Sequence, residues 1–166
     1  MQRRQLLGLG AALTVAPALA QAPYHLPGEE AVDPYVASDT NAGPRRITDP
    51  AVLSAFHGQD GIRRVVNDLV ETSVADPRIS EIFKATDLVR LRRTLFEQIC
   101  YLMDGGCDYT GRDMASAHKD QGLQPSDMNA LVENLQSAMD KERVPFSAQN
   151  RLLAILAPMK RDIVER

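Results

Sequence analysis

Three histidines are the side chains best suited to acid–base or metal chemistry, and each lies in a different setting. His25 falls in a proline-rich stretch and His57 in an expected turn, where a solvated imidazole is the ordinary outcome. His118 lies on an expected short helix, with Met114 one helical turn earlier on the same face. The residues between them are small, so a large flat group could approach this backbone closely. His118 is therefore the candidate ligand, and the alternative is a histidine at the surface or satisfied in the core.

No other familiar catalytic arrangement competes with this histidine. The sequence contains no nucleophile elbow, phosphate loop, H-E-x-x-H motif or C-x-x-C-H motif. Two cysteines cannot build a disulfide framework or a four-thiolate zinc site. The carboxylates are scattered and are interpreted as solvating charge. The basic run of Arg90, Arg92 and Arg93 is expected to border the surface, or else to meet the anionic edge of a cofactor.

Length and composition indicate one soluble globular domain with a modest extension. The chain has 166 residues, of which 44% are hydrophobic and 25% are charged. The net charge is −3, from 19 Lys+Arg against 22 Asp+Glu, which does not favour binding to nucleic acid through phosphate charge. Aromatic residues make up 5% and Trp is absent, so a base-stacking platform is not expected either.

Residues 1–20 have the pattern of an export signal. Arg3 and Arg4 precede an apolar stretch that ends at Ala18-Leu19-Ala20, which provides small residues around a bond cleaved after Ala20. The arginine pair favours the twin-arginine route over an ordinary secretory signal. We therefore expect a periplasmic or exported protein without an integral membrane span after cleavage. Residues 21–48, which contain four prolines, are expected to form an extended, poorly ordered lead-in.

From residue 49 to residue 166 the pattern is helical. Apolar side chains recur with the 3.6-residue period of a helix. The expected helices are marked by Ile62 to Val70, Leu88 to Leu102, Met128 to Met139 and Leu152 to Ile163, with short pieces around Ile79 to Phe83 and Asp113 to Lys119. Ser126 and Ser147 are expected to cap the last two long helices, and Pro158 to bend the final one. The sequence therefore predicts an all-α domain.

The segment that carries His118 resembles the central signature of group I truncated haemoglobins. The run from Gly105 to Met114, followed by Ala117-His118, is similar to the family's Gly-Gly-Pro-x-x-Tyr-Thr-Gly, Met and proximal His. Three further segments also resemble the family: Val74 to Arg78, Ile82-Phe83 and Leu152 to Met159. The resemblance covers about residues 50–165 and implies a truncated globin, a two-over-two helical sandwich that binds haem.

Carried over position by position, the resemblance makes His118 the proximal ligand of the haem iron. Its ring N–H would then bond a backbone carbonyl, such as that of Met114. The other positions that match haem contacts of the family are Phe83, Met114, Leu123, Leu91 and Leu95. The distal pocket is expected to contain Val70, Gln98 and Ile99. The implied cofactor is haem b, bound without a covalent link.

The distal pocket departs from the family pattern. Val70 stands where the family commonly has a Tyr that bonds O₂, and Leu95 stands where a Gln often assists. Neither side chain can donate a hydrogen bond. Gln98 is the one polar candidate for the distal pocket, and the alternative is that it points to solvent. The resemblance therefore implies a site that holds O₂ weakly.

The expected function is the binding of a diatomic gas, O₂, NO or CO, at a His-ligated haem iron. Redox chemistry on NO or peroxide, as a haem-dependent NO dioxygenase or peroxidase, would require an unidentified reductase. The alternative is a globin-fold sensor or binding module in which gas transport and turnover play no part.

Cys100 and Cys107 are expected to form a disulfide. Two glycines between them allow the chain to fold back to the Cα separation of about 5.5–6 Å that a disulfide needs. Export would place both residues in an oxidising compartment. The alternative is two separate thiols, with Cys100 buried in its helix.

Overall fold

The computed structural model describes residues 26–43 and 45–164. The expected export signal, residues 1–20, lies outside them. Within the described residues every regular element is a helix, which confirms the all-α prediction. The α-helices are α1 (Pro50–Ala55), α2 (Gly58–Ala75), α3 (Leu88–Leu102), α4 (Met114–Ala117), α5 (Pro125–Lys141), α6 (Phe146–Leu156) and α7 (Lys160–Ile163). The 3₁₀ helices are η1 (Asp39–Ala42), η2 (Ser80–Phe83) and η3 (Ala157–Met159). None of the helices described is long and apolar enough to cross a membrane.

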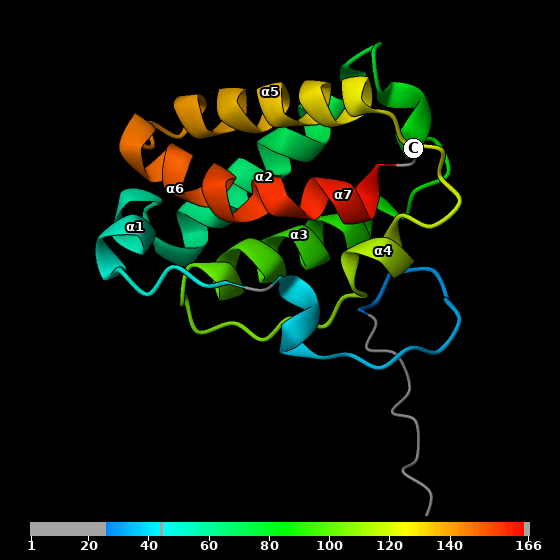
Figure 1. The fold of residues 1–166 in the computed structure, drawn as a ribbon, viewed down its shortest axis with the longest axis horizontal. Helices are drawn as coiled ribbons and strands as arrows, with labels where there is room; N and C mark the ends of the chain where they lie inside the picture. Colours follow the sequence, from blue (N-terminus) through cyan, green and yellow to red (C-terminus); the bar gives the residue numbers. More distant parts are fainter. Residues whose placement is uncertain (1–25, 44, 165–166) are drawn as a thin grey trace, which may run out of the picture.

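Two antiparallel helix pairs form the body of the molecule. Figure 1 shows α5 running against α6 and α7, and this pair lies over α2 and α3. α2 is the central element, because it packs against both α3 and α5. Its apolar face, Ile62, Val65 and Val66, is at most 1% exposed and meets Met139 of α5 and Leu152 of α6 in the main core. The arrangement is the predicted two-over-two sandwich.

Three helices begin at aspartates whose side chains accept hydrogen bonds from the first turn. Asp49 caps α1, Asp87 caps α3 and Asp113 caps α4. The expected caps on the last two long helices are wrong. α5 begins one residue after Gln124, whose backbone N–H donates to Asp127 at 2.8 Å, and α6 begins one residue after Pro145.

Pro158 interrupts the final helix as expected. It lies in η3, where the α-helical turn of α6 tightens into a 3₁₀ turn before α7 begins. A proline has no backbone N–H, so one helical hydrogen bond is missing there, and the helix changes its geometry at that point.

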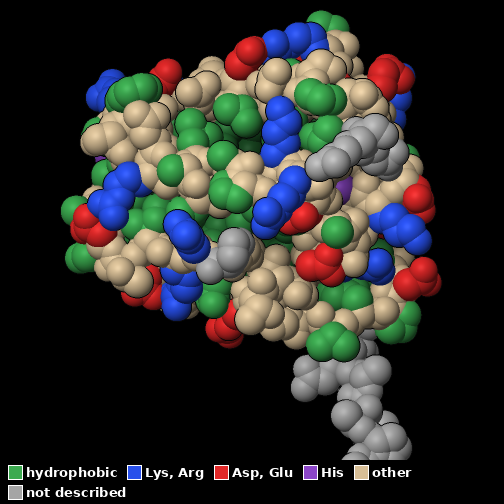
Figure 2. Space-filling model, viewed as in Figure 1, with side chains coloured by type: hydrophobic (Ala, Val, Ile, Leu, Met, Phe, Trp, Pro, Cys, Tyr) green, Lys and Arg blue, Asp and Glu red, His purple; other side chains and the backbone are tan. Residues whose placement is uncertain are grey.

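Charged side chains of both signs are interspersed on the face of the molecule drawn in Figure 2. Hydrophobic side chains are visible between them. Neither sign gathers into one broad patch on this face.

The turn between α1 and α2 requires a glycine at position 61. His57 has a left-handed backbone, with φ of 58°, so the chain reverses sharply there. The reversal brings the carbonyl oxygen of Phe56 to 1.8 Å from the place that a Cβ on Gly61 would take. A Cβ at that distance would clash with the carbonyl oxygen of Phe56, and a backbone atom cannot move aside as the end of a flexible side chain could.

Gly61→Ala is therefore expected to lower the free energy of unfolding by about 2 kcal/mol. The overpacking cost of up to about 3 kcal/mol exceeds the gain in helix propensity of about 1 kcal/mol. Urea denaturation measures the difference. Thr72→Ala, at an exposed position of the same helix, serves as the control and should change stability by less than about 0.5 kcal/mol. A Gly61→Ala protein as stable as the control would contradict the turn geometry.

The described part of the lead-in contains the 3₁₀ helix η1 and is docked on the rest of the molecule, not merely an extended, poorly ordered segment. Ala42 is fully buried and Ile47 is 5% exposed. The backbone N–H of Ile47 donates to the carbonyl of Leu102 at 2.6 Å. In Figure 1 the lead-in, in blue and cyan, passes beside α3 and α4. The composition of the segment alone could not reveal these partners, because they lie more than 50 residues away in the chain.

Cys100 and Cys107 form a disulfide in the structure, the pairing that the sequence predicts. The S–S distance is 2.00 Å and the Cα atoms are 5.7 Å apart. The bond closes the turn after α3, in which the backbone N–H of Gly105 donates to the carbonyl of Cys100 at 2.8 Å. A Cβ on Gly105 would lie 2.8 Å from the sulfur of Cys100, so the turn has room only for glycine there.

Replacing both cysteines with alanine is expected to lower the free energy of unfolding by roughly 2–3 kcal/mol, because the unfolded chain regains the entropy of a short loop. Urea denaturation with and without a reductant measures it. The reductant should reproduce the loss in the wild type and leave the double variant unchanged. Two titratable thiols in the denatured, unreduced wild type would contradict the disulfide.

Candidate functional site

The imidazole ring of His118 is held in one orientation by a backbone carbonyl. It follows α4 directly, and its backbone N–H donates to the carbonyl of Met114 at 3.2 Å. Its ring Nδ1 lies 2.8 Å from the same carbonyl oxygen. A carbonyl oxygen can only accept, so Nδ1 donates to it, and in the neutral imidazole Nε2 is then the nitrogen with the lone pair. This is the carbonyl partner expected from the sequence, and it fixes the ring orientation as carbonyl partners of metal-bound imidazoles do.

The free nitrogen of His118 suits a cofactor that supplies its own metal. Nε2 has no hydrogen-bond partner among the residues that the structure describes. Within the same residues no group of three or more His, Cys, Asp or Glu side chains could hold a bare metal ion. A single imidazole therefore fits a metal whose remaining ligands belong to a prosthetic group, as in haem.

The apolar residues of the predicted set lie on separate elements. Leu91 and Leu95 lie one turn apart on α3, Phe83 ends η2, and Met114 begins α4; all four are half-buried. The three buried members of the predicted set are Leu123 at 8%, Val70 at 1% and Ile99 at 3% exposure. Ile99 lies in the main core, with Leu95 packed against that core. Half-buried apolar groups gain from contact with a flat apolar ring, so this set fits the hydrophobic body of a haem.

Gln98 takes neither of the roles that the sequence suggested. The side chain is 6% exposed, so it does not point to solvent. Its amide nitrogen donates to the carbonyl of Ala42 at 2.9 Å and lies near the sulfurs of Met114 and Met159, at 3.7 and 3.8 Å. The amide hydrogens are thus used within the protein, and Gln98 is not a free donor for the distal pocket. The buried carbonyl of Ala42 requires such a donor.

Of the three arginines expected to border the surface, Arg93 is buried, whereas Arg90 and Arg92 are partly exposed. The side chain of Arg93 is 7% exposed and bonds the fully buried carboxylate of Glu29, with Nη2 and Oε2 3.0 Å apart. Burial by itself lowers the pKa of Arg93, but the hydrogen bond that it donates to Glu29 and the charge of Glu97 outweigh burial and raise it above its usual value.

Arg90 retains two buried nitrogens without a hydrogen-bond acceptor, Nε and Nη1. Its nearest acidic oxygens, on Glu29 and Asp87, are 3.5 Å away. Buried donors are normally bonded, and an unmade bond costs free energy. A carboxylate on the edge of a cofactor would supply the acceptor. This fits the second possibility given for the basic run, that it meets the anionic edge of a cofactor. Arg90 immediately precedes Leu91 on α3.

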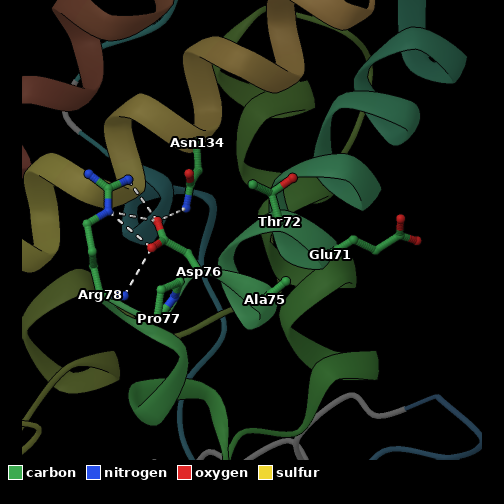
Figure 3. A pocket seen from close by; sticks show the side chains of 7 residues that line it. All are labelled: Glu71, Thr72, Ala75, Asp76, Pro77, Arg78 and Asn134. Carbon is green, nitrogen blue, oxygen red and sulfur yellow. Dashed lines mark hydrogen bonds and ion pairs between the residues drawn. The ribbon is translucent and has the colours of Figure 1, made fainter.

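A separate surface hollow of about 540 Å³ joins the end of α2 to α5. Figure 3 shows Asp76 at its centre, bonded to Arg78 and Asn134, while Glu71 points away. The hydrogen bonds from the Arg78 side chain, with those from its backbone and from Asn134, hold the pKa of Asp76 well below its usual range. Because these polar groups satisfy one another's hydrogen bonds, we interpret the cluster in the hollow as a structural link between α2 and α5.

Comparisons with known proteins agree with this fold. The family model described as Bacterial-like globin matches residues 52–165. A group 1 truncated hemoglobin of Tetrahymena thermophila is 30% identical over 90 residues, which are 54% of this chain and 74% of that protein. A group 1 truncated hemoglobin of Nostoc commune is 30% identical over 98 residues, 59% of this chain and 81% of that protein.

The fold also matches solved structures. The Fe(III) form of truncated hemoglobin from Tetrahymena pyriformis superimposes with a TM-score of 0.66 at 23% identity, over 69% of this chain and 98% of that one. The 2/2 hemoglobin of a Synechococcus species has a TM-score of 0.63 at 21% identity, over 69% and 98% of the two chains. Given the family match over most of the described chain, this protein belongs to the bacterial-like globins, and among them to the group 1 truncated haemoglobins.

Proposed function

We propose that this protein holds haem b non-covalently on Nε2 of His118 and binds a diatomic gas on the opposite side of the ring. The observation that carries the proposal is the 2.8 Å contact between Nδ1 of His118 and the carbonyl of Met114, which leaves Nε2 as the ring nitrogen available to a metal. When bound, the haem supplies an iron with an open coordination position for O₂, NO or CO, and the capacity for electron transfer.

The chain's own side chains would hold and orient the group. Phe83, Leu91, Leu95, Met114 and Leu123 supply apolar contact, and the two unpartnered nitrogens of Arg90 supply donors for an acidic edge. The absence of a C-x-x-C-H motif supports a non-covalent attachment.

The distal side would bind its ligand without hydrogen bonds from Val70, Leu95 or Gln98. Val70 and Leu95 have no polar hydrogens, and the amide of Gln98 bonds Ala42. Such a pocket favours NO and CO, which need little hydrogen bonding, over O₂, which is stabilised by a donor beside it.

Redox turnover of NO or peroxide is a further proposal, and it requires a reductase. We also propose that residues 1–20 direct export, so that the protein works in the periplasm. The disulfide between Cys100 and Cys107 supports an oxidising compartment. An assay of NO consumption with a supplied electron donor tests turnover, and N-terminal sequencing of the protein from a periplasmic extract tests export after Ala20.

Absorption spectra of the purified protein test the proposal as a whole. A Soret band is expected in the ferric and ferrous forms and is expected to shift when CO is added to the ferrous form. Acidified organic solvent should extract the haem completely, because no covalent bond retains it. A protein that binds no added haem, or whose haem resists extraction, would contradict the proposal.

A further inference from the structure

Four consecutive residues of the loop before α4, residues 109–112, form hydrogen bonds with the lead-in. Tyr109 donates its backbone N–H to Asp39 at 2.7 Å. The carbonyl of Thr110 accepts from the hydroxyl of Tyr35 at 2.8 Å, and the carbonyl of Gly111 accepts from the amide of Asn41 at 3.2 Å. The next residue, Arg112, donates to the carbonyl of Asp33 at 2.9 Å and stacks over the ring of Tyr35, 4.9 Å from its centroid.

The same loop is fastened to α3 from its other side. Thr110 donates both its backbone N–H and its hydroxyl to Glu97, at 3.0 and 2.7 Å. Arg93 bonds Glu97, the hydroxyl of Thr110 and the buried Glu29 of the lead-in. The lead-in, the loop and α3 thus share one partly buried polar network.

The loop determines where His118 lies. α4 has only four residues, and a helix of that length has no stability of its own in water. Asp113 directly follows the loop and caps the N-terminus of α4, and the helix ends directly before His118. Beyond the loop, its main packing partner is α7. Fixing residues 109–112 therefore fixes the entry of the helix whose last turn orients the imidazole.

We propose that Tyr35, Asp39 and Asn41 are positioning residues for His118, which act through the loop of residues 109–112. The proposal rests on the proposed function, because the expected effect is a change in the affinity of the protein for haem bound through His118. These three residues precede the family match, which begins at residue 52. Partners of a metal ligand that orient it typically contribute 10–100-fold to metal affinity.

Two sets of variants in the full chain test the proposal. Asp39→Ala removes the acceptor for Tyr109, whereas Asp39→Asn keeps an oxygen there and should restore wild-type behaviour. Tyr35→Phe with Asn41→Ala removes the bonds to Thr110 and Gly111. Arg46→Ala is the matched control, because Arg46 also ties the lead-in to the globin domain but bonds Tyr101 and Asp104, at the end of α3.

Haem transfer to excess apomyoglobin is the first measurement. We expect about tenfold or faster haem loss from Asp39→Ala and from the Tyr35/Asn41 double variant. Loss from Asp39→Asn and Arg46→Ala should remain within twofold of the wild type. The ferrous Fe–His stretching band should broaden or shift in Asp39→Ala and in the Tyr35/Asn41 double variant only. Equal rates in all five proteins, or equal acceleration in Arg46→Ala, would overturn the proposal.

Amide hydrogen exchange of residues 109–117 in the haem-free protein is the second measurement. Protection should fall in Asp39→Ala and in the double variant but not in Arg46→Ala. This result does not depend on haem, so a wild type that binds no haem would refute the proposed function while the exchange data still report on the loop. Unchanged protection in every variant would overturn the positioning role itself.

Discussion

Replacing His118 with glycine is expected to abolish stable haem binding, and added imidazole is expected to restore it. Among the histidines that the structure describes, His118 is the one whose Nδ1 bonds a backbone carbonyl, which leaves Nε2 available to a metal. Removing the ligand should weaken haem binding by more than the 10–100-fold typical of its supporting partners. Titration of the haem-free protein with haemin, followed at the Soret band, measures the change.

His57→Gln is the matched control for this prediction. The side chain of His57 is half-exposed, and its Nδ1 lies 2.8 Å from a carboxylate oxygen of Glu142, not from a backbone carbonyl. Its loss should leave haem affinity within twofold of the wild type. A His118→Gly protein that keeps the wild-type ferric spectrum and affinity without imidazole would contradict the assignment of His118.

Val70→Tyr is expected to slow the dissociation of O₂ about tenfold or more. The buried valine would be replaced by a side chain whose hydroxyl can donate a hydrogen bond to the ligand. A bond worth about 1.4 kcal/mol changes a dissociation rate tenfold, and such bonds strengthen in a dry pocket. CO dissociation should change much less, because bound CO accepts hydrogen bonds poorly. Stopped-flow ligand replacement measures both rates.

Val70→Phe separates the hydroxyl from the added bulk. It fills the same space without a donor, so its O₂ dissociation rate should stay near that of the wild type. Equal slowing by Phe and Tyr would show that bulk alone traps the ligand. A wild type that already releases O₂ as slowly as Val70→Tyr would mean that another donor serves the pocket, contrary to the apolar distal side.

The helices could be predicted where one face is continuously apolar. Ile62 to Val70 and Leu88 to Leu102 repeat with the helical period because each helix packs one face into the core. The helix ends were harder to predict, because several residue types can serve as caps. Gln124 and Pro145 precede α5 and α6, although serines nearby are the more usual choice.

At the site, the local part was predictable and the long-range part was not. His118 and its carbonyl partner lie four residues apart on one turn, so the sequence pattern contains their geometry. The role of Gln98 depends on Ala42, which is 56 residues distant and belongs to a segment without periodic signal. The docking of the lead-in has only a faint signal in its composition: Tyr35, Ala42 and Ile47 are residue types that an undocked linker has little use for.

Resonance Raman spectroscopy of the ferrous protein tests the central claim, that Nε2 of His118 binds the haem iron. We expect an iron–histidine stretching band that shifts to lower frequency when the histidines are labelled with ¹⁵N. In labelled His118→Gly reconstituted with unlabelled imidazole the isotope shift should disappear, and in labelled His57→Gln it should persist. An isotope shift retained in His118→Gly, or lost in His57→Gln, would show that another histidine is the ligand and would contradict the account.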